Sequence, residues 1–180
     1  AQILRSLKIP TIDTDELARI AVRPCSPALK KLLKKFGPEY FRKSDGALLR
    51  KKLGQLVFSN PQARQYINKI LHPEVLRLLN KKTKTLEKHN IRAVAVETPL
   101  LFEVGLQNRF DIICLVIVSK EVQTKRLLKK GLSQEEIRNR MASQISPEKK
   151  KKQSHYIINN SGARSQTRKQ VEKMLQTIFP

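Results

Sequence analysis

The 180 residues of the chain can bury a real core, and no run among the 39% apolar residues approaches the roughly 20 needed to span a bilayer. Two cysteines are too few for a disulfide framework and the first residues lack the features of a signal peptide, so we expect a cytoplasmic protein. The formal net charge of +22 favours phosphate-bearing partners, either nucleic acid or phosphorylated small molecules.

The first predicted strand ends in two carboxylates. The β-branched run Ile9–Ile12 is followed by Asp13 and Asp15, and a helical pattern starts at once. In α/β proteins the carboxyl ends of strands carry the chemistry, and two carboxylates so spaced can act as a base or bind magnesium. One of them can instead simply cap the helix, since aspartate is a favoured N-cap residue. The segment alone leaves both interpretations open.

A long helical stretch without strand signals lies between the first and second strands. Proline and glycine divide it into short helices, and a longer helix is predicted from about Gln62 towards His89 with a bend at Pro73. We expect this all-helical insert to cover a substrate. His72 has apolar neighbours, and a lone histidine in such a place is more often a core residue than a catalyst.

Three further apolar runs predict buried parallel strands: Ile91–Val96, Ile112–Val118 and Tyr156–Ile158. They are continuous rather than alternating, as in strands covered on both faces, and helical patterns separate them, which predicts βαβ units. Glu97 and Glu103 follow the first of these runs. Either can bind metal or substrate, or cap the next turn.

Helix start signals follow the strand that ends at Val118. Ser119 is a fair N-cap, Ser133 and Glu136 have the spacing of a capping box, and Ser146 precedes a proline at the first helical position. The last helix is predicted over Arg164–Ile178.

Positive side chains gather on the first two of these helices: Lys125, Arg126, Lys129, Lys130, Arg138 and Arg140. Such a helical pair can close over a transferring phosphoryl group and neutralise its charge, although an ordinary basic surface hairpin would have the same composition. Similarly, the turn Asn159–Gly162 can contact a base through its backbone or be a simple turn. Zinc spacings, a Gly-x-Ser-x-Gly elbow and a Gly-x4-Gly-Lys-Ser/Thr loop are all absent from the sequence.

Taken together, the segments resemble dephospho-coenzyme A kinase, a P-loop kinase similar to the nucleoside-monophosphate kinases. The resemblance runs nearly end to end, and its motifs occur in the family's order: Ile12-Asp13-Thr14-Asp15 with Ala18-Arg19, Phe36-Gly37-Pro38, Asp45-Gly46-x-Leu48-x-Arg50, Val57-Phe58-Ser59-Asn60-Pro61, Leu71-His72-Pro73, Pro99-Leu100-Leu101-Phe102-Glu103, Gln123-x-x-Arg126-Leu127, Arg140-x-x-x-Gln144 and Ile158-x-Asn160-x-Gly162.

The resemblance implies a three-layer α/β/α fold with a parallel sheet, a helical substrate-binding insert and a helical lid. The implied division is a nucleotide-binding core of residues 1–19, 90–120 and 154–180, a dephospho-coenzyme A-binding insert of residues 20–89 and a lid of residues 121–153. In the family, a central first strand and a glycine-rich Walker A loop precede the region where this chain begins. We therefore expect the chain to lack both, which could leave it inactive.

The implied reaction is phosphate transfer from ATP to the ribose 3′-hydroxyl of dephospho-coenzyme A, the last step of coenzyme A biosynthesis, with Mg²⁺ as cofactor. Asp15 would be the general base and Arg140 the lid arginine that stabilises the transferring group, while Asp13 would help to bind magnesium. The residues facing the acceptor would be Arg19, His72, Pro99, Leu101 and Glu103. Those facing ATP would be Arg126, Asn160 and Gly162.

Two alternatives to this activity remain. A degenerate basic protein could bind nucleic acid or phosphorylated ligands without catalysis, although aromatic residues are not interleaved with the basic ones as in single-strand binders. A kinase with another phosphate acceptor is the second. Two positions also depart from the family pattern: Gly54 stands where an arginine is frequent, and Lys130-Gly131 where an Arg-Asp pair is common.

Overall fold

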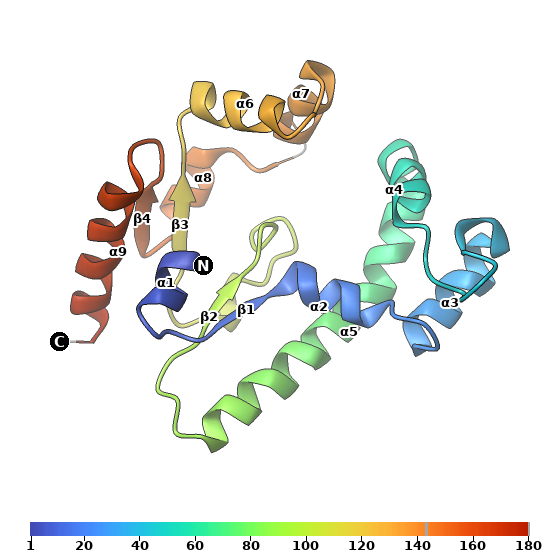
Figure 1. The fold of residues 1–180 in the computed structure, drawn as a ribbon, viewed down its shortest axis with the longest axis horizontal. Coiled ribbons are helices and arrows are strands. Elements are labelled where there is room, and N and C mark those ends of the chain that lie inside the picture. The colour runs from blue at the N-terminus through green and yellow to red at the C-terminus, as the bar shows by residue number, and fades with distance from the viewer. Residues whose placement is uncertain (143, 180) are drawn as a thin grey trace. The chain divides into compact units, whose positions relative to one another are not determined.

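A computed structural model describes residues 1–142 and 144–179 of the chain and has a mixed α/β fold (Figure 1). It divides into two compact units, Ala1–Thr98 and Pro99–Pro180. The described strands form two small sheets, each a parallel pair, so the expected α/β class is confirmed.

The first unit is mainly helical and contains one parallel strand pair. Its elements in chain order are α1 (Gln2–Ser6), β1 (Thr11–Asp13), α2 (Thr14–Ala21), α3 (Pro27–Phe36), the 3-10 turn η1 (Pro38–Tyr40), α4 (Arg50–Ser59), α5 (Pro61–Lys88) and β2 (Ala95–Glu97). The strands pair in the register Thr11 with Ala95 and Asp13 with Glu97. Pro73 lies inside α5, where its missing N–H removes one helical hydrogen bond.

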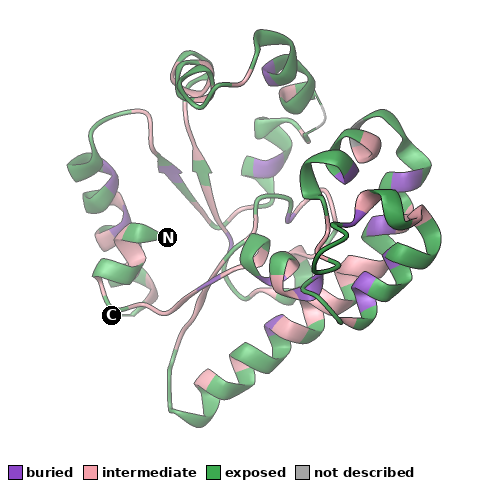
Figure 2. Ribbon diagram, turned by 45° about the vertical axis from the view of Figure 1, so that its right-hand side comes forward, coloured by how far each residue is buried: buried purple, intermediate pink, exposed green. Residues whose placement is uncertain are grey.

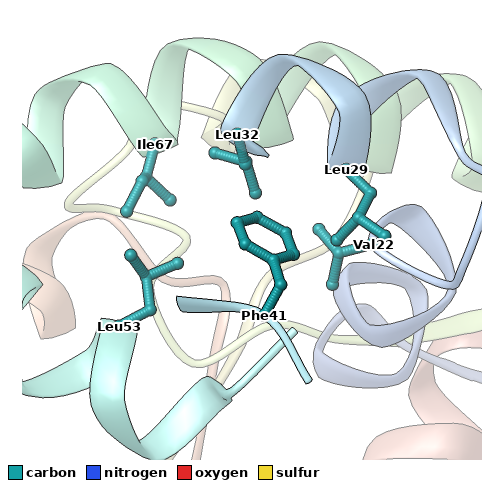
Figure 3. Packing of buried hydrophobic residues seen from close by; sticks show 6 residues of the cluster. All are labelled: Val22, Leu29, Leu32, Phe41, Leu53 and Ile67. Carbon is teal, nitrogen blue, oxygen red and sulfur yellow. The ribbon is translucent and has the colours of Figure 1, made fainter. Parts of the chain in front are cut away.

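The core of the first unit is a cluster of buried aliphatic side chains around one phenylalanine (Figure 3). Its members are Val22, Leu29, Leu32, Phe41, Leu53 and Ile67. They come from the end of α2, from α3 to α5, and from the loop after η1, so the cluster holds these helices together. Burying each such side chain contributes about 1.5–3 kcal/mol. The helical segment after β1 therefore has its own hydrophobic core.

The described residues of the second unit form one strand pair and four α-helices. Its elements are the 3-10 turn η2 (Gln107–Arg109), β3 (Cys114–Ile117), α6 (Lys120–Lys129), α7 (Gln134–Ala142), α8 (Pro147–Lys152), β4 (Tyr156–Asn159) and α9 (Arg164–Ile178). Strands β3 and β4 are parallel. Their pairing begins with Cys114 opposite Tyr156 and ends with Ile117 opposite Asn159. Helix α9 packs on β4 through a face that includes Val171 and Met174, both buried.

The predicted helix starts of the second unit are confirmed. The Ser119 hydroxyl accepts the Val122 N–H at 3.4 Å. Ser133 and Glu136 form a reciprocal capping box at 3.1 and 2.8 Å. These signals could be read from sequence because each involves residues only three apart.

The prediction that the apolar runs are buried on both faces is wrong in the second unit. Val116 of β3 is 60% exposed and Ile157 of β4 is 45% exposed. Within the described residues of this unit, α8 packs on β3 and α9 on β4, and the colouring by burial shows exposed and intermediate residues along this part of the chain (Figure 2). Two observed strands are also shorter than the apolar runs that predicted them, since β2 begins only at Ala95 and β3 at Cys114.

Candidate active site

The two strands of the first unit end side by side in acidic residues. Asp13 and Glu97 are register partners at the ends of β1 and β2. The Asp13 carboxylate caps α2: its Oδ1 accepts the N–H groups of Asp15 at 2.8 Å and Glu16 at 3.4 Å. The Thr14 hydroxyl donates to the Glu97 carbonyl at 3.0 Å and ties the start of α2 to β2. The capping interpretation is thus confirmed for Asp13, and its magnesium role stays a prediction.

Asp15 lies in the first turn of α2 with an exposed side chain. It follows the strand end directly, and its backbone is fixed by the hydrogen bond to Asp13. Arg19 is one helical turn further on, so both side chains lie on one face of α2. The Asp15 carboxylate and the Arg19 guanidinium thus lie on one face of α2, the helix that follows β1.

A second arginine lies close to Arg19. Arg50, the first residue of α4, donates from Nη2 to the Arg19 carbonyl at 3.2 Å. Partial burial lowers the pKa of the Arg50 guanidinium, and the nearby positive charge of Arg19 lowers it further. Two like charges held so near each other favour an anion as their common partner. Sequence reasoning quoted Arg50 only as a motif position, because no local pattern places it beside Arg19.

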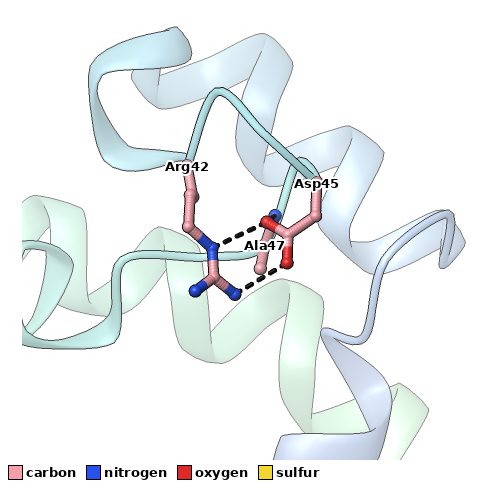
Figure 4. A network of polar contacts seen from close by, with 3 residues as sticks. All are labelled: Arg42, Asp45 and Ala47. Atoms are coloured by element: carbon pink, nitrogen blue, oxygen red, sulfur yellow. Dashed lines mark hydrogen bonds and ion pairs between the residues drawn. The ribbon is translucent and has the colours of Figure 1, made fainter.

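The loop before α4 is fixed by an ion pair (Figure 4). Asp45 accepts from Arg42 Nε at 2.8 Å and Nη2 at 2.7 Å, and also from the Ala47 N–H at 3.0 Å. The hydrogen bonds from the Arg42 side chain, and then that from Ala47, hold the pKa of the Asp45 carboxyl below its usual value. Gly46 has a φ of 67°, which glycine adopts without steric cost. This turn lies shortly before Arg50, the first residue of α4.

His72 is half-buried in α5, next to Pro73. Helix α5 packs against α2, the helix that carries Asp15 and Arg19. This packing keeps His72 within the helical part of the first unit, and its acceptor-binding role stays a prediction.

In the second unit, the predicted acceptor-facing segment has mixed exposure. Pro99 is exposed, whereas Leu101 is buried with 8% of its surface accessible. Glu103 Oε1 lies 2.6 Å from Lys150 Nζ and accepts the Ile145 N–H at 3.2 Å. Glu103 Oε2 is buried and has no hydrogen-bond partner in the described part of the chain.

The loops after β3 and β4 are joined at the carboxyl end of the second sheet. The Ser119 N–H donates to the Ser161 hydroxyl at 2.8 Å, and the Asn160 N–H donates to the Ile117 carbonyl at 2.8 Å. Asn160 is half-buried, and its Oδ1 accepts the Thr167 hydroxyl at 3.2 Å. The turn that contains Asn160 is therefore ordered by its own contacts. Such a strand end is where α/β proteins bind ligands.

Arg126 on α6 and Arg140 in the last turn of α7 are both exposed. Hydrogen bonds from Ser133 lower the pKa of the Glu136 carboxyl, and the charge of Arg140 adds to this effect. Glu136 and Arg140 are thus neighbours on one face of α7.

Within the described residues, no group of three or more His, Cys, Asp or Glu side chains could hold a metal ion. Over the same part of the chain, no helix combines the length and apolar character needed to cross a membrane.

Comparison with known proteins identifies the family of the chain. Residues 1–166 match the family described as dephospho-CoA kinase. The dephospho-CoA kinase of Syntrophotalea carbinolica is 36% identical over 181 residues, covering 100% of this chain and 85% of that protein. A crystal structure from Thermus thermophilus has 31% identity and a TM-score of 0.82, covering 99% of this chain and 89% of its own. The dephospho-CoA kinase from Campylobacter jejuni has 29% identity and a TM-score of 0.72, covering 98% and 88%.

The fold and these similarities define an ATP-dependent phosphotransferase. The chain belongs to the dephospho-CoA kinase family, whose members catalyse the final step of coenzyme A biosynthesis. Its substrates are therefore ATP and dephospho-coenzyme A. The α/β class, the activity and the acceptor expected from the motifs are confirmed, whereas the three-layer arrangement with its insert and lid and the role of each site residue stay predictions.

Proposed function

We propose that Asp15 is the general base that accepts the proton of the ribose 3′-hydroxyl of dephospho-coenzyme A. The observation that carries the proposal is its exposed carboxylate in the first turn of α2, directly after the end of β1. A general base must reach the proton in the reacting geometry, and the fixed backbone at Asp15 supports this. Phosphoryl transfer depends mainly on positioning and electrostatics, so the base is only one part of the site and has to be held within reach of the hydroxyl.

We further propose that Arg19 and Arg50 bind the diphosphate of the acceptor. Dephospho-coenzyme A carries this diphosphate on the 5′ carbon of the same ribose whose 3′-hydroxyl is phosphorylated. Asp15 and Arg19 are four residues apart in α2, about 6 Å along the axis, which matches groups on opposite sides of one ribose. Arg50 stands beside Arg19 and adds a second charge. Guanidinium groups suit phosphates because they donate two hydrogen bonds at once.

Arg140 is our candidate for stabilising the charge of the transferring phosphoryl group, with Arg126, Asn160 and Gly162 as contacts to ATP. The support is the exposure of both arginines and the ordered turn at the carboxyl end of β4. Charge stabilisation of this kind acts mainly in the transition state.

Magnesium fits the residues that are present. The ion usually takes one or two carboxylates together with substrate phosphates, so a cluster of three acidic groups is not needed. Both capping bonds of Asp13 use Oδ1, and Oδ2 takes part in neither. Asp13 would therefore hold the ion through Oδ2. The ion, when bound, supplies neutralisation of phosphate charge.

The finer organisation is proposed on the same resemblance. Residues 20–89 would be the acceptor-binding insert of a three-layer α/β/α kinase, and residues 121–153 its lid. His72, Pro99, Leu101 and Glu103 would face the acceptor, with Oε2 as the remaining oxygen of Glu103. A cytoplasmic location rests on the two free thiols, Cys25 and Cys114.

The test is ATP-dependent phosphorylation of dephospho-coenzyme A by Asp15→Asn, with Glu16→Gln as the matched control. Glu16 is the neighbouring exposed carboxylate in the same helical turn. Loss of a general base should lower kcat by about 10²–10⁴-fold, and the control should keep near-normal kcat. Similar rates for Asp15→Asn and the unchanged chain would reject the role of Asp15.

The charge of +22 leaves a competing role as a nucleic-acid binder to be tested. Such a complex would show an affinity that falls steeply with the logarithm of salt concentration. We expect dephospho-coenzyme A to bind in preference to an oligonucleotide at physiological salt. The opposite preference would favour the competing role.

A further inference from the structure

An ion pair with little exposed surface lies in the second unit. Lys149, Lys150, Lys151 and Lys152 follow one another in α8, and only Lys150 is buried. Its ammonium lies 2.6 Å from Glu103 Oε1, and the two side chains are 10% and 15% exposed. The Phe102 ring lies beneath the ammonium, 6.0 Å away. Lys150 therefore differs from the other lysines of this run, because it is buried and forms an ion pair with Glu103.

Glu103 holds its neighbouring segment at two points. The same oxygen that pairs with Lys150 also accepts the Ile145 N–H at 3.2 Å. Ile145 precedes the cap of α8 at Ser146, and Lys150 lies within α8. Burial raises the pKa of the Glu103 carboxyl, but the hydrogen bonds from Lys150 and the backbone outweigh it, so the pKa is lowered overall. Glu103 is therefore a carboxylate, and it fixes both sides of the α8 start.

This fixed point follows α7 closely in the chain. Arg140 lies in the last turn of α7, whose other end is joined to α6. The orientation of the last turn of α7 depends on the path of the chain that follows it. A small displacement of a charged group from the reacting atoms can cost about 10²-fold in rate. Ile145, which Glu103 holds, is the fifth residue after Arg140 in the chain.

We propose that the Glu103–Lys150 pair is a positioning element that fixes the C-terminal end of α7 and so places the Arg140 guanidinium for phosphoryl transfer. The proposal rests on the proposed role of Arg140. It assigns Glu103 a function different from contact with the acceptor. The two functions predict different kinetics, because a positioning residue alters kcat whereas an acceptor contact alters KM.

The experiment measures kcat and KM for dephospho-coenzyme A in Glu103→Gln, Lys150→Met and Lys150→Arg. We expect both neutral variants to lower kcat by about 10–100-fold with KM changed less than threefold. Lys150→Arg, which keeps the positive charge, should retain most of the kcat of the unchanged chain. The control is Glu172→Gln, which breaks an exposed ion pair with Arg168 in α9 and should leave kcat unchanged. A rise in KM without loss of kcat would overturn the proposal in favour of acceptor binding.

Two additional measurements separate positioning from a general loss of structure. In an Arg140→Ala background, Glu103→Gln should cost less than threefold further, because it acts through the same arginine. Full additivity would overturn the proposal, and so would an Arg140→Ala variant with normal kcat, which removes the role on which it rests. If a single variant unfolds, Glu103→Gln combined with Lys150→Met leaves no unpaired buried charge, and its kcat provides the same test.

Discussion

Removal of the Arg50 guanidinium should weaken binding of the acceptor diphosphate while leaving the chemistry intact. A hydrogen bond to a charged group contributes about 1.5–3 kcal/mol. Because Arg50 is largely exposed, solvent screens the interaction, and we take the lower limit. This corresponds to about a tenfold rise in the KM for dephospho-coenzyme A in Arg50→Ala. Arg50→Lys should recover only part of it, since lysine keeps the charge but loses the fork of donors.

The informative assay compares two acceptors at saturating ATP. Adenosine has the same ribose hydroxyl as dephospho-coenzyme A but no 5′ phosphates, so the Arg50→Ala substitution should leave its KM unchanged. Lys51→Ala, which removes the next cation on the same helix, should change either KM less than twofold. The reasoning is refuted if Arg50→Ala raises both KM values equally, because its effect would then be on the fold or on a group common to both acceptors.

Three other predictions concern the lid arginine, the core and the acidic turn. Arg140→Ala should lower kcat far more than it raises KM. Arg138 is an exposed arginine on the same helix, and Arg138→Ala should change neither value by more than threefold. Equal loss in kcat and affinity would make Arg140 a binding residue. Leu32→Ala should lower the free energy of unfolding by about 2–5 kcal/mol in urea titrations and Leu33→Ala by less than about 0.5, since Leu32 is 0% exposed and Leu33 43%; similar losses would contradict the described core. The lowered pKa of Asp45 contributes stability that is present above its unfolded-state pKa and is lost as pH falls through the folded-state value. The substitution Asp45→Asn should therefore flatten the decline of the urea midpoint below about pH 4. An unchanged decline would count against the Arg42 contact.

Features set by near neighbours in the chain could be predicted from sequence. The capping box of Ser133 and Glu136 and the span of the last helix, Arg164–Ile178, were predicted as the structure has them. The parallel pairing of the strands was also predicted, since helical crossovers separate them. Such features depend on spacing and on residue type, and both are visible in one sequence.

Features that depend on tertiary contact could not be predicted. Arg50 lies beside Arg19, and Lys150 beside Glu103, although many residues separate the members of each pair. A run of lysines gives no sign that one of them is buried. Likewise, the apolar run that contains Val116 does not show that its side chain is exposed, because exposure depends on what else covers the sheet.

The cap formed by Asp13 limits which residues that position can tolerate. Serine, threonine and asparagine cap a helix about as well as aspartate, so stability alone would accept any short polar side chain. A magnesium ligand adds the need for a negative charge, which those three lack. Glutamate has the charge, but it is not among the favoured N-cap residues. Aspartate is therefore the one residue that would meet both demands, and a position with both roles would tolerate no substitution that a position with the cap alone accepts.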